Sequence, residues 1–349
     1  MISKQSFERS HIERAAALYP KMDSGKIEIA VFAFGLLDEL IRSGLPLIFK
    51  GGTSLLLLLE RPQRISTDID IIVPPHVDFD RIFEKAKKRF PFYEGEERGA
   101  RSNKSFRHFY FMFAGPKSGK ECRINLDVAF EENPYPRTLD KEIKAPFLLT
   151  TGEGTFVKVP SCESILGDKL TAFAPSTIGV NPFATSLGKP IDNRLQVMKQ
   201  FYDISRLTEC ALDYDEIAIS YKKNQTFENN FRNTLYTVKE TLLDTFNHAA
   251  EVASMGFWNK GSDFYSDVAR PGIQGLASNA FEGKYNQLDA IADASKIMLL
   301  VARLLVGKED DESPSGYKDA KLKLFKSVTK PEIFADIRRA LFLISSISQ

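Results

Sequence analysis

The chain has 349 residues, of which 43% are hydrophobic and 27% charged, a composition that allows two folded domains and excludes large-scale disorder. Its 47 basic and 46 acidic residues give a formal net charge of +1, which excludes a global attraction to nucleic acid and leaves only local patches for RNA contact. Three widely spaced cysteines without a C-x-x-C pair argue against zinc and against a disulfide framework.

The sequence carries no membrane or secretion signal. The first residues lack the apolar core of a signal peptide. The leucine run at 55–59 is far too short to span a bilayer. We therefore expect a cytoplasmic protein without membrane contact.

The first predicted elements are helices over residues 6–18 and 25–43, followed by a strand-rich stretch from 45 to 130. Residues 45–49 form a short apolar run of buried-strand length, and two glycines follow it. A leucine-rich run from Thr53 to Glu60 is typical of a buried helix. The pattern predicts a strand, a tight turn and a helix.

The glycine turn is a candidate phosphate site. Gly51 and Gly52 can adopt backbone angles closed to other residues and allow a ligand to approach the main chain. We expect Thr53 or Ser54 to cap the helix, whose first N–H groups and dipole favour a phosphate. The alternative is an ordinary tight turn.

Two carboxylates come next. Asp68 and Asp70 lie two residues apart in a segment that reads as a strand, so both side chains are expected on one face. Their repulsion would be relieved by a hard divalent cation, and Mg²⁺ binds through one or two carboxylates plus substrate phosphates. The alternative is a solvated edge with two surface aspartates.

A third carboxylate lies on another predicted strand, residues 121–130, where apolar and polar residues alternate strictly. Asp127 is on the polar face. If this strand pairs beside the one bearing Asp68 and Asp70, the three acids converge and hold metal, or the third takes a proton from an attacking hydroxyl. Otherwise Asp127 pairs with Arg123 or another exposed base.

Basic residues gather in two stretches, 85–89 on one predicted helix and 98–110, where aromatic residues lie among them, and basic residues among aromatics suit phosphates and splayed bases. A solvated helix end and hairpin explains the same pattern. The residues concerned are Lys85, Lys87, Lys88, Arg89, Arg98, Arg101, Lys104, Arg107 and His108, with Phe106, Phe109 and Tyr110.

Together, the Lys-Gly-Gly-Thr-Ser-Leu turn, the Arg-x-Ser-x-Asp-x-Asp strand and the later acid resemble the AbiEii/AbiGii toxin family of nucleotidyltransferases, within the polymerase-beta-like superfamily. The gap between Gly52 and Asp68 is slightly longer than is common there. Two further stretches resemble the family's second half, residues 165–173 around Lys169 and residues 201–204, which end in Tyr-Asp-Ile. The resemblance covers about residues 30–210.

Lys169 lies inside the apolar arc of its predicted helix, so its ammonium needs an anion or must reach water. Toward a nucleotide pocket it would neutralise a triphosphate or its leaving group. Asp203 lies at the margin of its own helix's apolar arc. It could pair with Lys169, orient it or contact the substrate, and the sequence does not separate these roles.

The organisation changes near residue 155. We expect an α+β fold with a nucleotidyltransferase-like mixed sheet flanked by helices in residues 1–155, and an α-helical domain in residues 156–349 that contributes Lys169 and Asp203 to the site. A long polar stretch, residues 174–194, is expected to be a functional or mobile loop.

The resemblance implies a metal-dependent transfer of NMP from an NTP to an acceptor. Asp68, Asp70 and Asp127 would hold Mg²⁺ or Mn²⁺, and Lys169 would offset charge on the triphosphate. The residues expected to hold the nucleotide are Lys50, Gly51, Gly52, Thr53, Ser54, Arg64 and Ser66. The acceptor would be RNA, such as tRNA, and the protein a toxin of a toxin–antitoxin or phage-defence pair with an antitoxin encoded nearby.

Other functions remain open. A glycosyltransferase also uses Asp-x-Asp to hold a metal on a nucleotide sugar, although the upstream Gly-Gly turn argues against it. A nucleotide-binding interaction module without turnover is a second alternative, and three clustered acids argue against that one. Within transferases, a protein or a small molecule could replace RNA as the acceptor.

Overall fold

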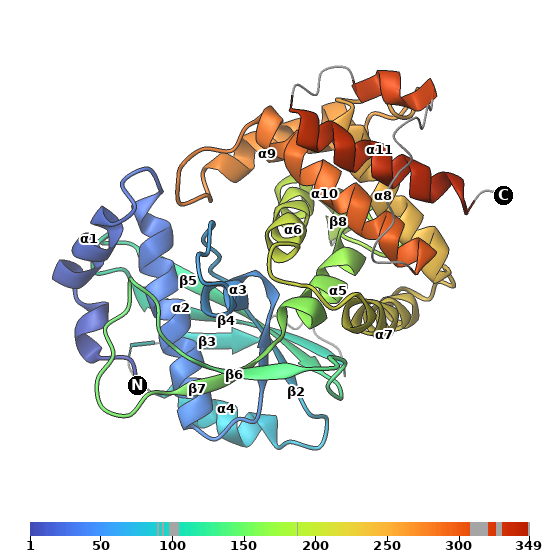
Figure 1. Ribbon diagram of the computed structural model, residues 1–349. Helices are drawn as coiled ribbons and strands as arrows, with labels where there is room; N and C mark the ends of the chain where they lie inside the picture. Colours follow the sequence, from blue (N-terminus) through green and yellow to red (C-terminus); the bar gives the residue numbers. More distant parts are fainter. Residues whose placement is uncertain are drawn as a thin grey trace. The chain divides into compact units, whose positions relative to one another are not determined.

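The computed structural model describes residues 1–88, 91–92, 94–97, 105–186, 188–307, 320–325 and 330–347 (Figure 1). The chain divides into two compact units. The first contains Met1–Ser161 and a returning segment, Ser278–Lys284, and the second contains Cys162–Ala277 and Tyr285–Gln349. Each unit is described by itself.

The first unit is built on a seven-stranded mixed sheet in the order β3-β4-β5-β2-β1-β7-β6. Strand β2 runs parallel to β5 and β1 parallel to β7, whereas the other neighbours are antiparallel. The expected mixed sheet is therefore confirmed. Its strands are β1 (Ile48–Lys50), β2 (Ile69–Val73), β3 (Glu94–Glu97), β4 (Phe106–Ala114), β5 (Glu121–Phe130), β6 (Thr138–Glu142) and β7 (Phe156–Pro160).

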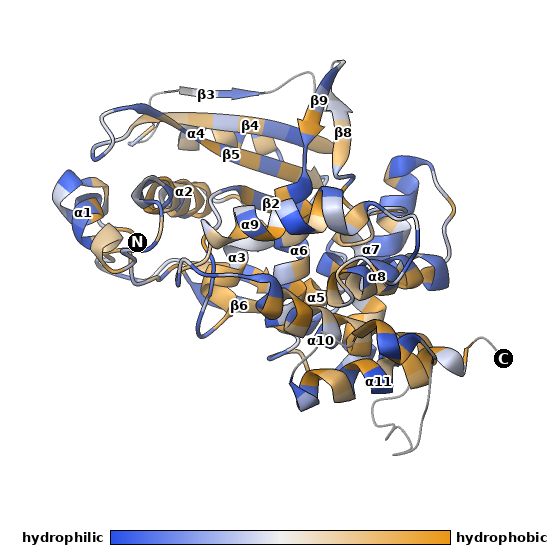
Figure 2. Cartoon of the chain, turned by 90° about the horizontal axis from the view of Figure 1, so that it is seen from above, coloured by the Kyte–Doolittle hydropathy of each residue, from blue (hydrophilic) through white to orange (hydrophobic). Residues whose placement is uncertain are grey.

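One face of this sheet is covered by α2 and α4. Phe32 of α2 stacks on Phe113 of β4 with ring centroids 3.8 Å apart, and Phe83 of α4 packs on Phe109 at 4.4 Å. Alternation along β4 and β5 sends their buried apolar residues to this face. Figure 2, coloured by hydropathy, shows hydrophobic and hydrophilic residues along the same two strands. The helical elements of the unit are η1 (Lys4–Phe7), α1 (Arg9–Ala17), α2 (Ser24–Arg42), α3 (Gly51–Leu58) and α4 (Phe79–Lys87).

The opposite face carries a small apolar cluster across the central strands. Ile72 of β2 is in register with Ile48 of β1 and with Ala129 of β5, which in turn is in register with Phe106 of β4. Tyr135 packs over this row. Because side chains repeat every second residue along a strand, the positions two residues away on each strand form another row on the same face.

The second unit is helical, as expected from the spacing of its apolar residues. Its helical elements are α5 (Cys162–Ala172), α6 (Arg194–Leu207), α7 (Tyr214–Arg232), α8 (Val238–Ala253), η2 (Tyr265–Ala269), α9 (Arg270–Ala277), α10 (Gln287–Val306), η3 (Ala320–Phe325) and α11 (Pro331–Ser345). Helices α5 and α7 approach closely at Gly167, where a Cβ would lie 2.6 Å from the Tyr221 backbone nitrogen.

Two features of this unit differ from the sequence-based expectations. The stretch 174–194 is not a plain loop, because it contains an antiparallel hairpin of β8 (Phe183–Ser186) and β9 (Lys189–Asp192). Cys162, at the start of α5, forms a disulfide with Cys210, which follows α6. Their separation of 48 residues gives no local pattern, so only the packing of α5 against α6 brings the two thiols together.

Within the described part of the chain, no helix has the length and apolar content needed to cross a membrane.

A buried polar network joins α6 to α10 in the second unit. Asp293, with a side chain only 3% exposed, accepts hydrogen bonds from Ser205 Oγ at 2.6 Å and Tyr285 Oη at 2.7 Å and forms an ion pair with Arg206. Burial raises the pKa of Asp293, whereas the Arg206 charge favours its ionised form. A buried charge of this kind depends on its partner.

Asp293→Asn should therefore lower the free energy of unfolding by about 3 kcal/mol, because it removes the buried anion that pairs with the Arg206 charge. Asp192→Asn is the matched control, since it removes the anion of the exposed Arg194–Asp192 pair and solvent screens that loss. Urea unfolding of both variants makes the comparison. Equal stability of the two variants would contradict the role given to Asp293.

Candidate active site

Four polar residues form a row across the face of the sheet opposite α2 and α4. Lys50 of β1 is in register with Asp70 of β2, Asp70 with Asp127 of β5, and Asp127 with His108 of β4. Register partners in neighbouring strands present their side chains on the same face. The sequence analysis expected Asp70 and Asp127 to converge if their two strands paired. In the structure β2 and β5 do pair, and the pairing brings Asp70 and Asp127 together.

Asp68 lies just before β2, and a hydrogen bond to a side chain of β5 holds it on the same face. Its Oδ1 accepts a hydrogen bond of 2.9 Å from Asn125 Nδ2, and Asn125 lies two residues before Asp127. The Asp68 carbonyl accepts a 2.5 Å hydrogen bond from Thr53 Oγ1. Asp68 is therefore hydrogen-bonded both to β5, the strand that carries Asp127, and to α3, the helix that begins at the glycine turn.

Asp127 pairs with a basic side chain, as the alternative in the sequence analysis allowed, but the partner is His108 and not Arg123. His108 Nδ1 lies 2.8 Å from Asp127 Oδ1, whereas the Arg123 guanidinium lies 5.9 Å from the centre of the Tyr110 ring. The Asp127 side chain keeps 41% of its surface exposed, so a ligand can still reach it. His108 was missed as a site residue, because only the register of β4 against β5 places it here.

The glycine turn approaches the carboxylates closely. Gly51 has φ +74°, and a Cβ on it would collide with the Asp70 carboxylate. A Cβ on Gly52 would lie 2.5 Å from Arg64 Nη2 and 3.1 Å from Ser66 Oγ. Gly51 is thus required by contact and by conformation and Gly52 by contact alone, and the turn lies against Asp70, Arg64 and Ser66.

The capping prediction for Thr53 and Ser54 was wrong. Helix α3 begins at Gly51, with Lys50 as its N-cap residue, and no side chain caps it. Thr53 donates to the Asp68 carbonyl, and Ser54 Oγ donates to the Gly51 carbonyl at 2.9 Å. The first backbone N–H groups of α3 have no intrahelical acceptor, and such groups are what an anion requires.

Arg64 is held from an unexpected part of the chain. It is buried, its Nη1 donates to the Ile65 carbonyl at 3.1 Å, and its backbone bridges to Ala280. The Ile65 N–H donates to the Asn279 carbonyl at 2.9 Å. The returning segment 278–284 therefore fixes the strip that leads into Asp68, and no sequence pattern predicted this support.

The donor set suits a hard cation. Asp70 and Asp127 supply carboxylate oxygens on adjacent strands, and Asp68 lies beside them. Among the described residues, no group of three or more His, Cys, Asp or Glu side chains has the arrangement of a ready metal site. Mg²⁺ is commonly held by one or two carboxylates completed by water and substrate phosphates, so the residues present fit such an ion with the nucleotide as a further source of ligands.

Lys169 and Asp203 meet in the second unit. Lys169 Nζ lies 3.0 Å from Asp203 Oδ2 and donates a 2.8 Å hydrogen bond to Gln200 Oε1. The two residues are only 6% and 1% exposed, respectively. Of the roles left open for Asp203, pairing with Lys169 is the one that the structure contains, and Gln200 is a partner that sequence reasoning missed.

The basic and aromatic stretch is only partly described. Arg107 forms ion pairs with Glu97 and Asp80 at 2.7 Å each, and its guanidinium lies 4.9 Å from the centre of the Phe109 ring. The hydrogen bonds that Arg107 donates to Glu97 raise the pKa of Arg107. Arg107 is thus neutralised within the protein. Arg89, Arg98, Arg101 and Lys104 lie outside the described residues.

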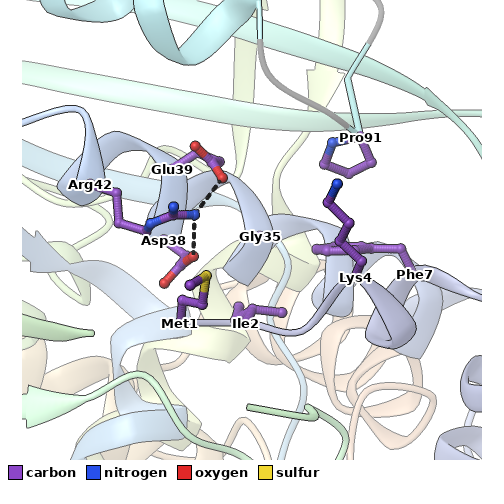
Figure 3. Close-up of a pocket in the computed structure, with 9 residues that line it drawn as sticks. All are labelled: Met1, Ile2, Lys4, Phe7, Gly35, Asp38, Glu39, Arg42 and Pro91. Carbon is purple, nitrogen blue, oxygen red and sulfur yellow. Dashed lines mark hydrogen bonds and ion pairs between the residues drawn. The ribbon is translucent and has the colours of Figure 1, made fainter. Parts of the chain in front are cut away.

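A cavity of about 310 Å³ lies away from this site (Figure 3). It is lined by the N-terminal residues and by α2, the helix that covers the other face of the sheet. Arg42 contacts Glu39 at 3.0 Å and Asp38 at 3.8 Å along its wall. The cavity therefore does not contain the carboxylate row.

A glycine turn at a helix N-terminus, set against carboxylates on neighbouring strands of a mixed sheet, is the arrangement of a nucleotidyltransferase catalytic unit. Residues 36–256 match the family model described as nucleotidyl transferase AbiEii toxin, type IV TA system. Because the match spans more than half of the 349 residues, the chain belongs to this family.

Two solved structures also match this chain. The crystal structure of JHP933 from Helicobacter pylori is 11% identical with a TM-score of 0.44, and the similarity covers 87% of this chain and 95% of that one. The crystal structure of a putative nucleotidyltransferase from H. pylori is 14% identical with a TM-score of 0.43, covering 80% and 98%. No curated protein matches the sequence.

Gly51→Ala should lose ligand binding as well as stability. The left-handed backbone at Gly51 costs alanine about 1 kcal/mol, and the added methyl displaces Asp70. Gly119→Ala is the matched control, because Gly119 has a similar φ of +66° with nothing within 4 Å of the added Cβ. Thermal unfolding should show destabilisation of both, larger for Gly51→Ala because only its methyl meets a neighbour, and calorimetric titration with Mn²⁺ and NTP should show weakened binding only for Gly51→Ala. Equal binding by the two variants would contradict the close approach.

Proposed function

We propose that this protein transfers NMP from an NTP to an RNA acceptor in a metal-dependent reaction. The observation that carries the proposal is the row in which Asp70 and Asp127 occupy register positions on adjacent strands, directly beside the Gly51 turn. The turn offers backbone donors for phosphate oxygens, and the carboxylates offer ligands for the cation that accompanies a nucleotide.

We assign each group of residues a role from its chemistry. Asp68, Asp70 and Asp127 would hold Mg²⁺ or Mn²⁺, which when bound neutralises phosphate charge and assists the in-line displacement. The N–H groups of Gly51 to Ser54 orient the triphosphate, and Lys50, Arg64 and Ser66 lie beside the same turn. Asp127, held by His108, is placed to accept the proton of the acceptor hydroxyl or to complete the metal site.

Family membership supports the proposed partner and substrate, and the acceptor is a proposal of its own. Membership in a type IV toxin–antitoxin family implies a cognate antitoxin and an NTP substrate. We propose RNA, with tRNA as the first candidate, as the acceptor, and a cytoplasmic site of action. Protein and small-molecule acceptors are the alternatives, and a binding module without turnover is the least supported because it needs no such cluster of acids.

The assay is incubation of the purified protein with Mg²⁺, each of the four α-³²P-labelled NTPs and total cellular RNA. Asp70→Asn and Asp127→Asn should each lower transfer at least roughly 100-fold, because each removes charge where the transition state needs it, and EDTA should abolish transfer. Asp140→Asn is the matched control on an exposed β6 carboxylate. Transfer that survives Asp70→Asn would refute the proposed function, and metal-dependent NTP binding without transfer would favour the binding module.

Lys169 is proposed to act on the triphosphate as well as to pair with Asp203. Lys169→Met alone should lower the free energy of unfolding by about 3 kcal/mol, since it removes the cation with which the buried Asp203 carboxylate forms its ion pair. Adding Asp203→Leu should restore stability by removing that charge. NMP transfer should stay low in the stable double variant. If transfer recovers together with stability, the Lys169–Asp203 pair has only a structural role, and the proposed action of Lys169 on the triphosphate is refuted.

A further inference from the structure

Ser176, His248 and Asp244 form a hydrogen-bonded chain in the second unit. Ser176 Oγ lies 3.3 Å from His248 Nε2, and His248 Nδ1 lies 2.9 Å from Asp244 Oδ1. Ser176 belongs to the segment after α5, whereas Asp244 and His248 are one turn apart on α8. None of these three residues belongs to the carboxylate row or to the Lys169–Asp203 pair.

The hydrogen-bond partners fix the tautomer of His248. Its Nδ1 faces two oxygens, the Asp244 carboxylate and the Asp244 carbonyl, at 2.9 Å each. Both are acceptors only, so the Nδ1 atom carries the ring proton and the neutral ring leaves Nε2 as an acceptor. The Ser176 hydroxyl therefore donates to Nε2, which is the direction in which a histidine removes a proton from serine.

Asp244 is held rigidly enough to orient the ring. Its second oxygen, Oδ2, accepts hydrogen bonds from the Ser176 N–H at 3.0 Å and from Thr177 Oγ1 at 2.8 Å. The Phe264 ring packs against the imidazole with centroids 4.2 Å apart. The carboxylate thus binds the serine loop and the histidine at once, and the base keeps one orientation.

The serine loop is ordered and accessible. The Thr177 and Gly179 N–H groups donate to the Ala174 carbonyl at 3.1 Å and 2.7 Å, and a Cβ on Gly179 would lie 2.5 Å from the Ala174 nitrogen. Ser176 itself is exposed, and a hydroxyl that accepts a nucleotide must be accessible to it. A preorganised base beside an exposed hydroxyl is the feature of an activated serine nucleophile.

We propose that Ser176 is an acceptor hydroxyl for nucleotidyl transfer, so that the protein modifies itself on this serine. The inference rests on the nucleotidyltransferase activity proposed above, and it names a protein acceptor in addition to RNA. Ser176 Oγ attacks the α-phosphorus of the NTP and forms an O–P bond. The bond from the α-phosphorus to the bridging oxygen breaks, pyrophosphate leaves with the electron pair, and the hydroxyl proton passes to His248 Nε2.

The test is incubation of the full-length protein with Mg²⁺ and each NTP, with and without total RNA, followed by peptide mass spectrometry. The peptide containing Ser176 should gain the mass of one nucleoside monophosphate less water. Ser176→Ala should abolish that modification, and His248→Gln should lower its rate by roughly 100-fold, the smaller end of what a general base contributes. Asp70→Asn should abolish it by inactivating the transferase.

Ser266→Ala is the matched control, because Ser266 is an exposed serine of the same unit whose hydroxyl contacts the Asp263 carbonyl and Asp267 and no imidazole. It should leave modification of Ser176 unchanged. Thermal unfolding and RNA labelling are measured on the Ser176→Ala variant as well, to show that this variant is folded and active.

The outcomes separate the two proposals. Labelled RNA without modification of Ser176 would overturn this inference and leave the proposed function intact. Modification of other residues only, or a rate at Ser176 that His248→Gln does not change, would also overturn it. Absence of transfer to RNA and to protein alike would refute the proposed function, and the inference with it.

Discussion

The candidate site depends on the register between four neighbouring strands. Asp70 and Asp127 are adjacent because β2 and β5 run parallel with these two residues opposite each other, and β1 and β4 add Lys50 and His108 to the same row. A slip of one residue in any strand would turn its side chain to the face covered by α2 and α4. The register is fixed by hydrophobic burial, since the row around Ile72 lies on the same face and packs under Tyr135.

The site also shows how function constrains the backbone. Gly51 adopts a left-handed conformation directly against the Asp70 carboxylate, and Gly52 makes room for Arg64. A side chain at either position would separate the turn that we propose to bind phosphate from the acids that would hold the metal. The arrangement keeps the main-chain donors of α3 next to carboxylate ligands, so that one triphosphate can contact both.

In the second unit, polar groups are kept inside the protein where apolar groups would be easier to accommodate. The Lys169–Asp203 pair is almost completely buried, and burying two charges is costly unless their geometry and further hydrogen bonds compensate. Gln200 supplies one such bond. The chain through Ser176, His248 and Asp244 is different in character, because its hydroxyl end reaches solvent while its carboxylate end is buried. The first arrangement holds a charge in place, and the second presents a reactive group.

The sequence by itself determined the local structure and the chemical types at the site. Strict alternation over 121–130 predicted β5 and placed Asp127 on its polar face, and the two glycines before a leucine run predicted the strand, turn and helix. These predictions succeeded because side-chain periodicity and glycine conformations are local properties. The cap at Thr53 or Ser54 was wrong because the helix begins earlier, at Gly51, so that Thr53 donates to the distant Asp68 carbonyl and Ser54 to the Gly51 carbonyl within the helix.

Only the tertiary structure decided which distant residues meet. His108 joins Asp127 through the register of β4, the segment 278–284 supports Arg64 from more than 200 positions away, and His248 reaches Ser176 from another helix. Sequence patterns carry no record of such pairings, since strand order and helix packing arise from burial summed over the whole unit. The chain therefore encodes the functional groups locally, and the fold selects the partners that make them a site.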